Sequence, residues 1–176
     1  EHLQDILLSD TSQSFLLALT SFVNFLSRGD ATLSVQPFLA GASLTALAKK
    51  DGGTRPVAAG ECLRRLVSKC HCATEKASAA LGFGGSQFGV AAPCGTERVV
   101  HKARTVFARH QLDADFVVVK FDLKNAFNLV SRASFLRLVH ELLPDMYPWV
   151  QWCYASNPNL TFSPFDPILS REGVQQ

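Results

Sequence analysis

The sequence predicts an α+β protein in which an antiparallel sheet packs against helices. Apolar residues recur at helical spacing in several stretches of the chain. A glycine-containing turn separates two stretches with the composition of strands, and a run rich in β-branched residues follows at 116–121. This mixture of helical and strand patterns indicates the α+β class.

Composition is that of a folded chain of ordinary domain size. Hydrophobic residues make up 47 % of the 176 positions and charged residues 18 %, which favours a globular protein over a disordered one. No run approaches the roughly 18 apolar residues that a membrane span needs, so we expect no membrane partner. The chain begins with Glu1 and His2 and has no signal-peptide pattern, and we expect it to be a fragment of a longer protein.

The cysteines do not form a recognisable framework. There are five, at irregular spacing, which argues against a secreted disulfide scaffold. The triplet Cys70-His71-Cys72 invites a metal-site interpretation, but it falls in a helical pattern, where residues two apart point in nearly opposite directions. We therefore expect reduced thiols in a packed core.

Charge is distributed unevenly along the chain. The net charge is only +2, yet residues 49–109 hold eleven Lys or Arg against four Asp or Glu. A basic region of this kind favours a phosphate-rich partner. A solvated basic face explains the same pattern.

In the first half of the chain, the patterns predict two helices and a hairpin. A helix is expected over 11–28, capped by Thr11 or Ser12. A β-hairpin is expected over 42–59, and Pro56 restricts its second strand to a sheet edge or a short pairing. A second helix is expected from Glu61 to about Ala80.

In the second half, a glycine-rich loop at 82–89 precedes a helix over 95–110. The inward face of that helix is expected to carry Val99, Val100, Ala103, Val106 and Phe107. The run 116–121 predicts a buried central strand that ends on Asp122. Further elements are expected as helices over 131–143 and 146–154 and as paired short strands over 160–162 and 168–170.

Asp122 is the residue with the clearest chemical potential. A carboxylate at the end of a buried strand is costly unless a cation or a donor meets it. Two-metal phosphoryl transfer needs hard oxygen ligands held beside a triphosphate. From spacing alone, Asp122 could equally be a cap for the following turn.

The segment around Asp122 resembles a known sequence motif. Residues 121–128, FDLKNAFN, are similar to motif A of reverse transcriptases of the non-LTR retroelement type. Four further sequence blocks follow the order found in that family, and the resemblance covers about residues 41–176. The blocks are KKDGGTRPVA at 49–58, GECLRRLVSK at 60–69, QFGV with GTE and His101 at 87–101, and SREGVQQ at 170–176, which resembles the start of motif B.

The resemblance implies roles for the residues of motif A. Asp122 would bind two Mg²⁺ ions, and the backbone carbonyl of Leu123 would add a ligand. Phe127 would lie under the sugar of the incoming nucleotide and exclude a 2′-hydroxyl. Without the resemblance, Phe127 would be taken for a core aromatic.

The resemblance also implies roles for cations and for motif B. Lys49 or Lys50, together with Arg55, would hold the triphosphate; the alternative is a solvated hairpin. Gln176 would lie near the incoming nucleotide. On the helix after the hairpin, the candidates for contacts with the template backbone are Arg64, Arg65 and Lys69, for which a solvated helix face is the alternative.

Residues 1–40 lie outside the resemblance, and we expect them to be a helical lead-in. The resemblance implies that residues 41–110 are a fingers-like region and that residues 111–176 are the incomplete front of a right-hand polymerase palm. The implied activity is RNA-directed DNA polymerisation with two Mg²⁺ ions in the full-length enzyme. The partners would be an RNA template, a DNA primer, deoxynucleoside triphosphates, and the remaining palm and thumb of the same polypeptide. The expected location is intracellular, and nuclear for a retrotransposon protein. The fragment alone is expected to be inactive.

Two other functions stay open at this point. The chain could be a degenerate, non-catalytic remnant of a retroelement that still binds nucleic acid. It could also be a structural or interaction module whose motif is accidental. The other two metal-binding aspartates of the family lie beyond motif B, and neither Asp145 nor Asp166 replaces them.

Overall fold

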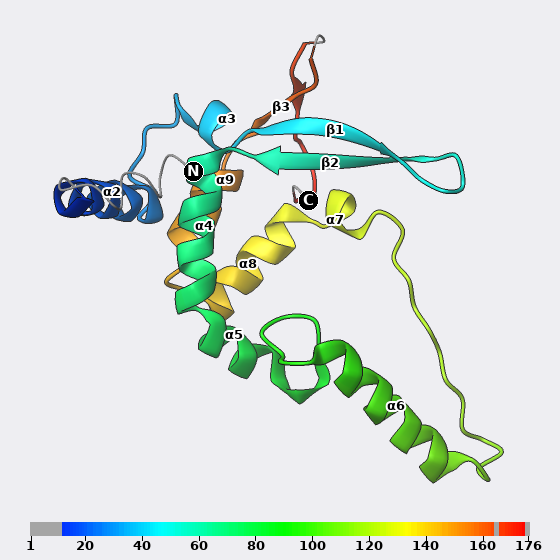
Figure 1. The fold of residues 1–176 in the computed structure, drawn as a ribbon. Coiled ribbons are helices and arrows are strands. Elements are labelled where there is room, and N and C mark those ends of the chain that lie inside the picture. Colours follow the sequence, from blue (N-terminus) through cyan, green and yellow to red (C-terminus); the bar gives the residue numbers. More distant parts are fainter. Residues whose placement is uncertain (1–11, 164–165, 175–176) are drawn as a thin grey trace.

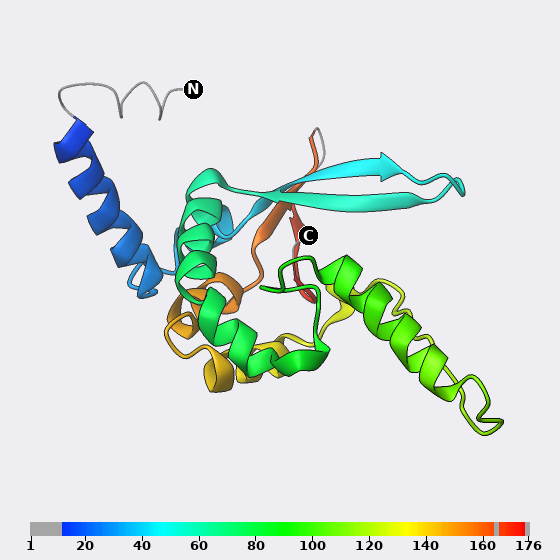
Figure 2. The same cartoon turned by 60° about the horizontal axis from the view of Figure 1, so that its bottom comes forward.

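The computed structural model describes residues 12–163 and 166–174, which form eight α-helices and a four-stranded mixed sheet (Figures 1 and 2). The predicted α+β class is confirmed. None of the described helices is long and apolar enough to cross a membrane. The helices are α2 (Ser12–Ser27), α3 (Gln36–Leu39), α4 (Cys62–Thr74), α5 (Lys76–Phe83), α6 (Gly95–His110), α7 (Ala126–Leu129), α8 (Arg132–Leu142) and α9 (Tyr147–Tyr154).

Most predicted helices are present within a residue or two, but the one expected from Glu61 to Ala80 divides into α4 and α5. The break lies at Glu75. Just before it, the Thr74 hydroxyl lies 3.3 Å and 3.0 Å from the carbonyl oxygens of Cys70 and His71. Such local side-chain bonds compete with the helix ladder and bend it. The predicted cap Thr11 lies outside the described residues, and Ser12 is already helical.

The sheet has the strand order β2-β1-β3-β4, in which β1 (Ala42–Ala48) and β2 (Thr54–Gly60) form the predicted antiparallel hairpin. Because β2 is an edge strand, Pro56 is tolerated there, as expected. The short strands β3 (Asn159–Thr161) and β4 (Ile168–Leu169) are antiparallel partners, also as expected.

The expectation of a wholly antiparallel sheet is wrong, because β1 and β3 are parallel. A parallel neighbour requires a long crossover connection. Here the chain passes through α4 to α9 before it returns beside β1 (Figure 1). The pairing also joins a strand of the predicted fingers-like region to a strand of the predicted palm region.

The hydrophobic core lies where α2, α4 and α9 meet, next to the base of the hairpin (Figure 1). Trp149 and Trp152 of α9 stack with ring centroids 5.5 Å apart and are almost fully buried. Both indole N–H groups are satisfied, by the Ser68 hydroxyl at 3.1 Å and the Ala31 carbonyl oxygen at 2.7 Å. Buried indoles need such partners, so this core holds α9 in one orientation against α4.

The predicted buried strand at 116–121 is not formed. Residues 116–123 contain no strand and run as an extended connection between α6 and α7 (Figure 1). Val118 is 59 % exposed and Phe121 85 % exposed. A strand is stable only beside a neighbour that accepts its hydrogen bonds, and no described segment pairs with this one. Asp122 therefore lies in a loop rather than at a strand end.

The predicted inward face of the helix over 95–110 is also wrong. Helix α6 has no buried residue, and Val99, Val100 and Phe107 are all more than 40 % exposed, because the helix projects from the body (Figures 1 and 2). On α4, Arg64 is only 9 % exposed, so the alternative of a solvated helix face is wrong for this residue.

The cysteine expectation holds in part. Within the described residues all five thiols are free, but only Cys153 is buried. Burial raises the pKa of the Cys153 thiol to about 11, so this thiol belongs to the packed core. The other four are exposed. The described residues contain no group of three or more His, Cys, Asp or Glu that could hold a metal ion, which leaves the triplet at 70–72 without support as a metal site.

Candidate functional site

A cavity of about 620 Å³ lies between the tip half of the hairpin and the segment after Asp122. Its size is within the range of small-molecule sites in proteins, roughly 300–1,000 Å³. Four residues singled out from the sequence border it: Lys49 and Arg55 from the hairpin, and Asp122 and Phe127 from the segment. The first and last of these are 78 positions apart in the chain, so the fold brings the two motifs together.

The hairpin turn fixes the position of Lys49. The Lys49 amide donates to the Gly53 carbonyl oxygen at 2.7 Å, and the Gly53 amide donates to the Asp51 carboxylate at 3.1 Å. Gly52 has a φ of +81°, which a side chain would oppose. The register pairs Leu47 with Arg55, so alternation along the strands puts Lys49 and Arg55 on the same face of the hairpin. Thus the two cations are diagonal neighbours.

The other side of the cavity is a tight turn. After Asp122 and Leu123 the chain turns at Asn125, which has a φ of +54°. Asparagine adopts this left-handed conformation more readily than most residues. Helix α7 starts immediately afterwards, and it presents Phe127, 55 % exposed, to the cavity. Phe127 is thus a surface aromatic here, and the alternative of a core aromatic is wrong.

The segment that resembles motif B packs against the backbone of α7. The Val174 amide donates to the Phe127 carbonyl oxygen at 2.7 Å. Gly173, with a φ of +64°, lies so close to the backbone of Asn128 that a Cβ atom at this position would overlap its carbonyl oxygen. Only glycine fits this approach. Residues 173–174 are therefore fixed beside α7.

Arg132, which the sequence analysis missed, holds this arrangement. Its guanidinium donates to the Ser170 hydroxyl at 2.7 Å and to the carbonyl oxygens of Gly173 and Glu172 at 3.0 Å and 3.2 Å. It also lies over the Tyr154 ring, 5.3 Å from the centroid. Burial lowers the pKa of Arg132, but an arginine stays charged. Only its position as the first residue of a helix after motif A could have signalled this role.

Most of the remaining candidate residues do not border this cavity. Leu123 lines it, whereas Lys50 lies in the exposed hairpin turn and is not among its lining residues. Gln176 lies outside the described residues. Arg64 is directed inward, where it donates to the Ala40 carbonyl oxygen at 2.8 Å and the Tyr154 hydroxyl at 3.2 Å. Its expected contact with a template is therefore wrong, because the guanidinium is part of the folded interior.

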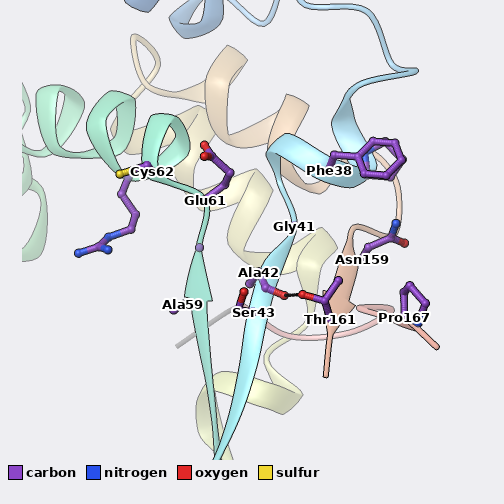
Figure 3. A pocket seen from close by; sticks show the side chains of 13 residues that line it. Phe38, Gly41, Ala42, Ser43, Ala59, Glu61, Cys62, Asn159, Thr161 and Pro167 are labelled. Carbon is purple, nitrogen blue, oxygen red and sulfur yellow. Dashed lines mark hydrogen bonds between the residues drawn. The ribbon is translucent and has the colours of Figure 1, made fainter. Parts of the chain in front are cut away.

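Arg65 borders a second cavity, of about 540 Å³, that shares no lining residue with the first. Figure 3 shows this cavity between the start of α4, with Glu61 and Cys62, and a second wall made by Phe38 of α3, Gly41 and Asn159 of β3. If Arg65 contacts a template, as predicted, the contact would be at this second cavity and not near Asp122. Lys69 is exposed on α4, where the prediction for it stays a prediction.

The charged side chains that line the first cavity favour an anionic ligand. Lys49, Arg55 and Lys124 face one carboxylate, that of Asp122. Lys124 is a further cation at the cavity that was not predicted from the sequence; its place inside the segment that resembles motif A is the signal that could have indicated it. None of these four side chains is in an ion pair with another described residue. Three unpaired cations around one carboxylate suit a ligand with several negative charges.

The donors present suit Mg²⁺ as a companion of such a ligand. Magnesium is commonly bound by one or two carboxylates together with substrate phosphates. The Asp122 carboxylate is exposed and forms no ion pair with another described residue, and Leu123 also lines the cavity. Among the described residues that line the cavity, Asp122 is the only acidic one. These residues fit one ion that a phosphate also ligates.

Comparisons of this chain with protein-family models, with curated proteins and with solved structures found no match.

Proposed function

We propose that this chain is the fingers and front-palm part of a reverse transcriptase and that the cavity at Asp122 receives the incoming deoxynucleoside triphosphate. The observation that carries the proposal is the convergence of the hairpin cations with Asp122 and Phe127 on one cavity. The resemblance to reverse transcriptases predicts that these residues belong to one site. Their positions around one cavity support this proposal.

Each residue would contribute a distinct interaction. Lys49 and Arg55 would neutralise the triphosphate, with Arg55 able to grip two oxygens at once. The ring of Phe127 would lie against the sugar. Asp122 and the Leu123 carbonyl would hold Mg²⁺, which supplies charge stabilisation for the attacking and leaving oxygens when it is bound. The primer 3′-oxygen would attack the α-phosphorus, and pyrophosphate would leave.

The full catalytic reaction would need more than this chain. Two ions need more carboxylates than the single one at the cavity. We propose that the other carboxylates, the thumb and the second half of the palm belong to the same polypeptide. An RNA template and a DNA primer would be the macromolecular substrates. The chain alone would bind nucleotide without extending a primer.

A nucleotide-binding titration tests the proposal. We expect the chain to bind a deoxynucleoside triphosphate more tightly with Mg²⁺ than with a chelator. Asp122→Asn should weaken binding in Mg²⁺ by about tenfold, equivalent to ~1.4 kcal/mol, and should abolish the difference between Mg²⁺ and chelator.

Asp115→Asn is the matched control, since Asp115 is an exposed acid outside the cavity. Equal effects of the two variants would contradict the assignment of Asp122. A folded chain with no nucleotide binding at all would favour the non-catalytic remnant. In an enzyme that contains the whole palm and thumb, Asp122→Ala should abolish primer extension.

A further inference from the structure

We propose that residues 119–123 pair with the same residues of a second copy of this chain, as two antiparallel strands related by a two-fold axis at Phe121. The partner is therefore the chain itself, and the product is a homodimer. The pairing uses the segment whose predicted strand is not formed within the single chain. It does not depend on polymerase activity.

The segment has the backbone of a strand that lacks a neighbour. Residues 117–123 run extended between α6 and α7 (Figure 1), and within the described part of the chain none of their backbone groups bonds to another backbone group. Unpaired N–H and C=O groups along an extended segment are a template for another strand. Every residue from 117 to 123 is exposed, so this template is accessible to a partner.

Apolar and charged side chains alternate along the segment. Val119, Phe121 and Leu123 are apolar and are 65 %, 85 % and 76 % exposed. The residues between them, Lys120 and Asp122, are charged and form no ion pair with another described residue. Alternate residues of a strand point to opposite faces. The paired segment therefore has one apolar face and one charged face, and a partner strand must match both.

Charge complementarity selects a second copy in one register. In an antiparallel pair centred on Phe121, Lys120 lies opposite Asp122 of the second copy, and two-fold symmetry forms the same pair again on the other side of the centre. Centring the pair on residue 120 would place Lys120 opposite Lys120, and centring it on residue 122 would place Asp122 opposite Asp122. Like charges directly opposite each other are destabilising. The segment is thus self-complementary only when it is centred on Phe121.

The same register brings the apolar side chains together. Phe121 lies opposite Phe121 of the second copy, and Val119 lies opposite Leu123 of the second copy on the same face. Aromatic and β-branched cross-strand pairs stabilise such ribbons. Because a five-residue ribbon is a small interface, the dimer belongs to the weak end of protein–protein contacts, with a dissociation constant on the order of 100 µM.

The dimer engages the carboxylate that borders the first cavity. Asp122 lines that cavity in the single chain, and in the dimer it pairs with Lys120 of the second copy. If the cavity receives a nucleotide with Mg²⁺, as in the proposed function on which this consequence rests, the nucleotide and the second copy compete for Asp122. Each ligand then weakens the binding of the other by the same factor.

Charge-swapped variants test the pairing. Sedimentation velocity of the whole chain at several concentrations should show a monomer–dimer equilibrium. Lys120→Glu and Asp122→Lys should each weaken the dimer about thirtyfold, because two attractive cross-strand pairs become repulsive. An equimolar mixture of these two variants should dimerise again, since each strand then supplies the charges that the other needs. The two changes combined in one chain should also restore the dimer.

Lys69→Glu and Asp115→Lys are the matched controls, since they make the same changes of charge at exposed positions outside the paired segment. Alone or mixed, they should leave the dimer unchanged. A chain that stays monomeric at roughly ten times the expected dissociation constant would overturn the proposal. A dimer that the charge swaps neither weaken nor restore would overturn it as well.

Hydrogen exchange locates the interface and separates it from the nucleotide site. The amides of residues 119–123 should exchange more slowly as the protein concentration rises. Protection already present in a monomer, of this chain or of a longer polypeptide, would give the segment a partner within its own chain and overturn the proposal. A deoxynucleoside triphosphate with Mg²⁺ should dissociate the dimer. A dimer that passes the charge-swap test but does not respond to the nucleotide would support the pairing and contradict the role of Asp122 in the proposed function.

Discussion

The backbone amide of Val174 donates a hydrogen bond to the carbonyl oxygen of Phe127 over 2.7 Å. This bond links the start of the motif B segment to the helix that presents Phe127 to the cavity. A change in the backbone at 173–174 is therefore expected to act on the cavity as well as on stability.

Gly173→Ala should destabilise the fold more than the same change at Gly52. Both glycines have a positive φ, which costs an L-residue about 1–2 kcal/mol. A Cβ atom at 173 would in addition overlap the Asn128 carbonyl oxygen, whereas nothing lies within 4 Å at 52. The free energy of unfolding from urea titration measures both. Equal losses in the two variants would contradict the close approach of Gly173 to Asn128.

Arg132→Lys should lower the free energy of unfolding by about 1–3 kcal/mol, because an ammonium cannot replace several guanidinium bonds at once. Arg137→Lys is the control on the same helix, since Arg137 has only an exposed pair with Glu141 at 3.5 Å. Such pairs contribute little. If Arg137→Lys lowered the free energy of unfolding as much as Arg132→Lys, the hydrogen bonds of Arg132 would not explain the loss of stability.

Lys49→Ala should weaken nucleotide binding by roughly fivefold, since a charge-assisted contact is lost. Lys50→Ala, the adjacent change, should have a much smaller effect because Lys50 does not border the cavity. Isothermal titration with a deoxynucleoside triphosphate measures both constants. The sequence leaves the choice between these lysines open, and a larger effect at Lys50 would reverse the choice made from the structure.

Phe127→Ala should reduce discrimination between deoxy- and ribonucleoside triphosphates, because the ring that would occupy the space of the 2′-hydroxyl is gone. The measurement is the ratio of the two dissociation constants in the chain and of the two incorporation rates in a full-length enzyme. Phe121→Ala is a suitable control, since Phe121 is exposed nearby but does not line the cavity. Unchanged sugar selectivity in Phe127→Ala would remove the proposed gate.

Stability should fall in mild acid because of His71. Burial lowers the pKa of His71 below its usual 6.5, while Glu75 and Asp145 oppose the shift. The unfolded chain therefore binds more protons below about pH 6.5, and the free energy of unfolding decreases as the pH falls from 6.5 through the lowered pKa. His71→Gln should flatten this part of the profile, and His101→Gln, an exposed change on α6, should not. An unaltered profile in His71→Gln would contradict the assignment of this loss of stability to the lowered pKa of His71.

Local sequence determined most helices and the hairpin of this protein. The turn residues Asp51, Gly52 and Gly53 specify a tight reversal, and helical spacing specifies α2, α8 and α9. These features depend on interactions between residues close in the chain. The motif resemblance predicts Arg55, Asp122 and Phe127 for one site, together with Lys49 or Lys50. In the structure, Lys49 and the other three residues border one cavity, and Lys50 does not.

Tertiary structure decided what depends on distant partners. The run at 116–121 has the composition of a strand, but no described segment accepts its hydrogen bonds, so it stays extended and exposed. Arg64 and Arg132 look like surface cations in the sequence, yet backbone carbonyl oxygens from far along the chain meet their guanidinium groups. Composition and spacing cannot encode such contacts, because they exist only after the helices have packed around Trp149 and Trp152.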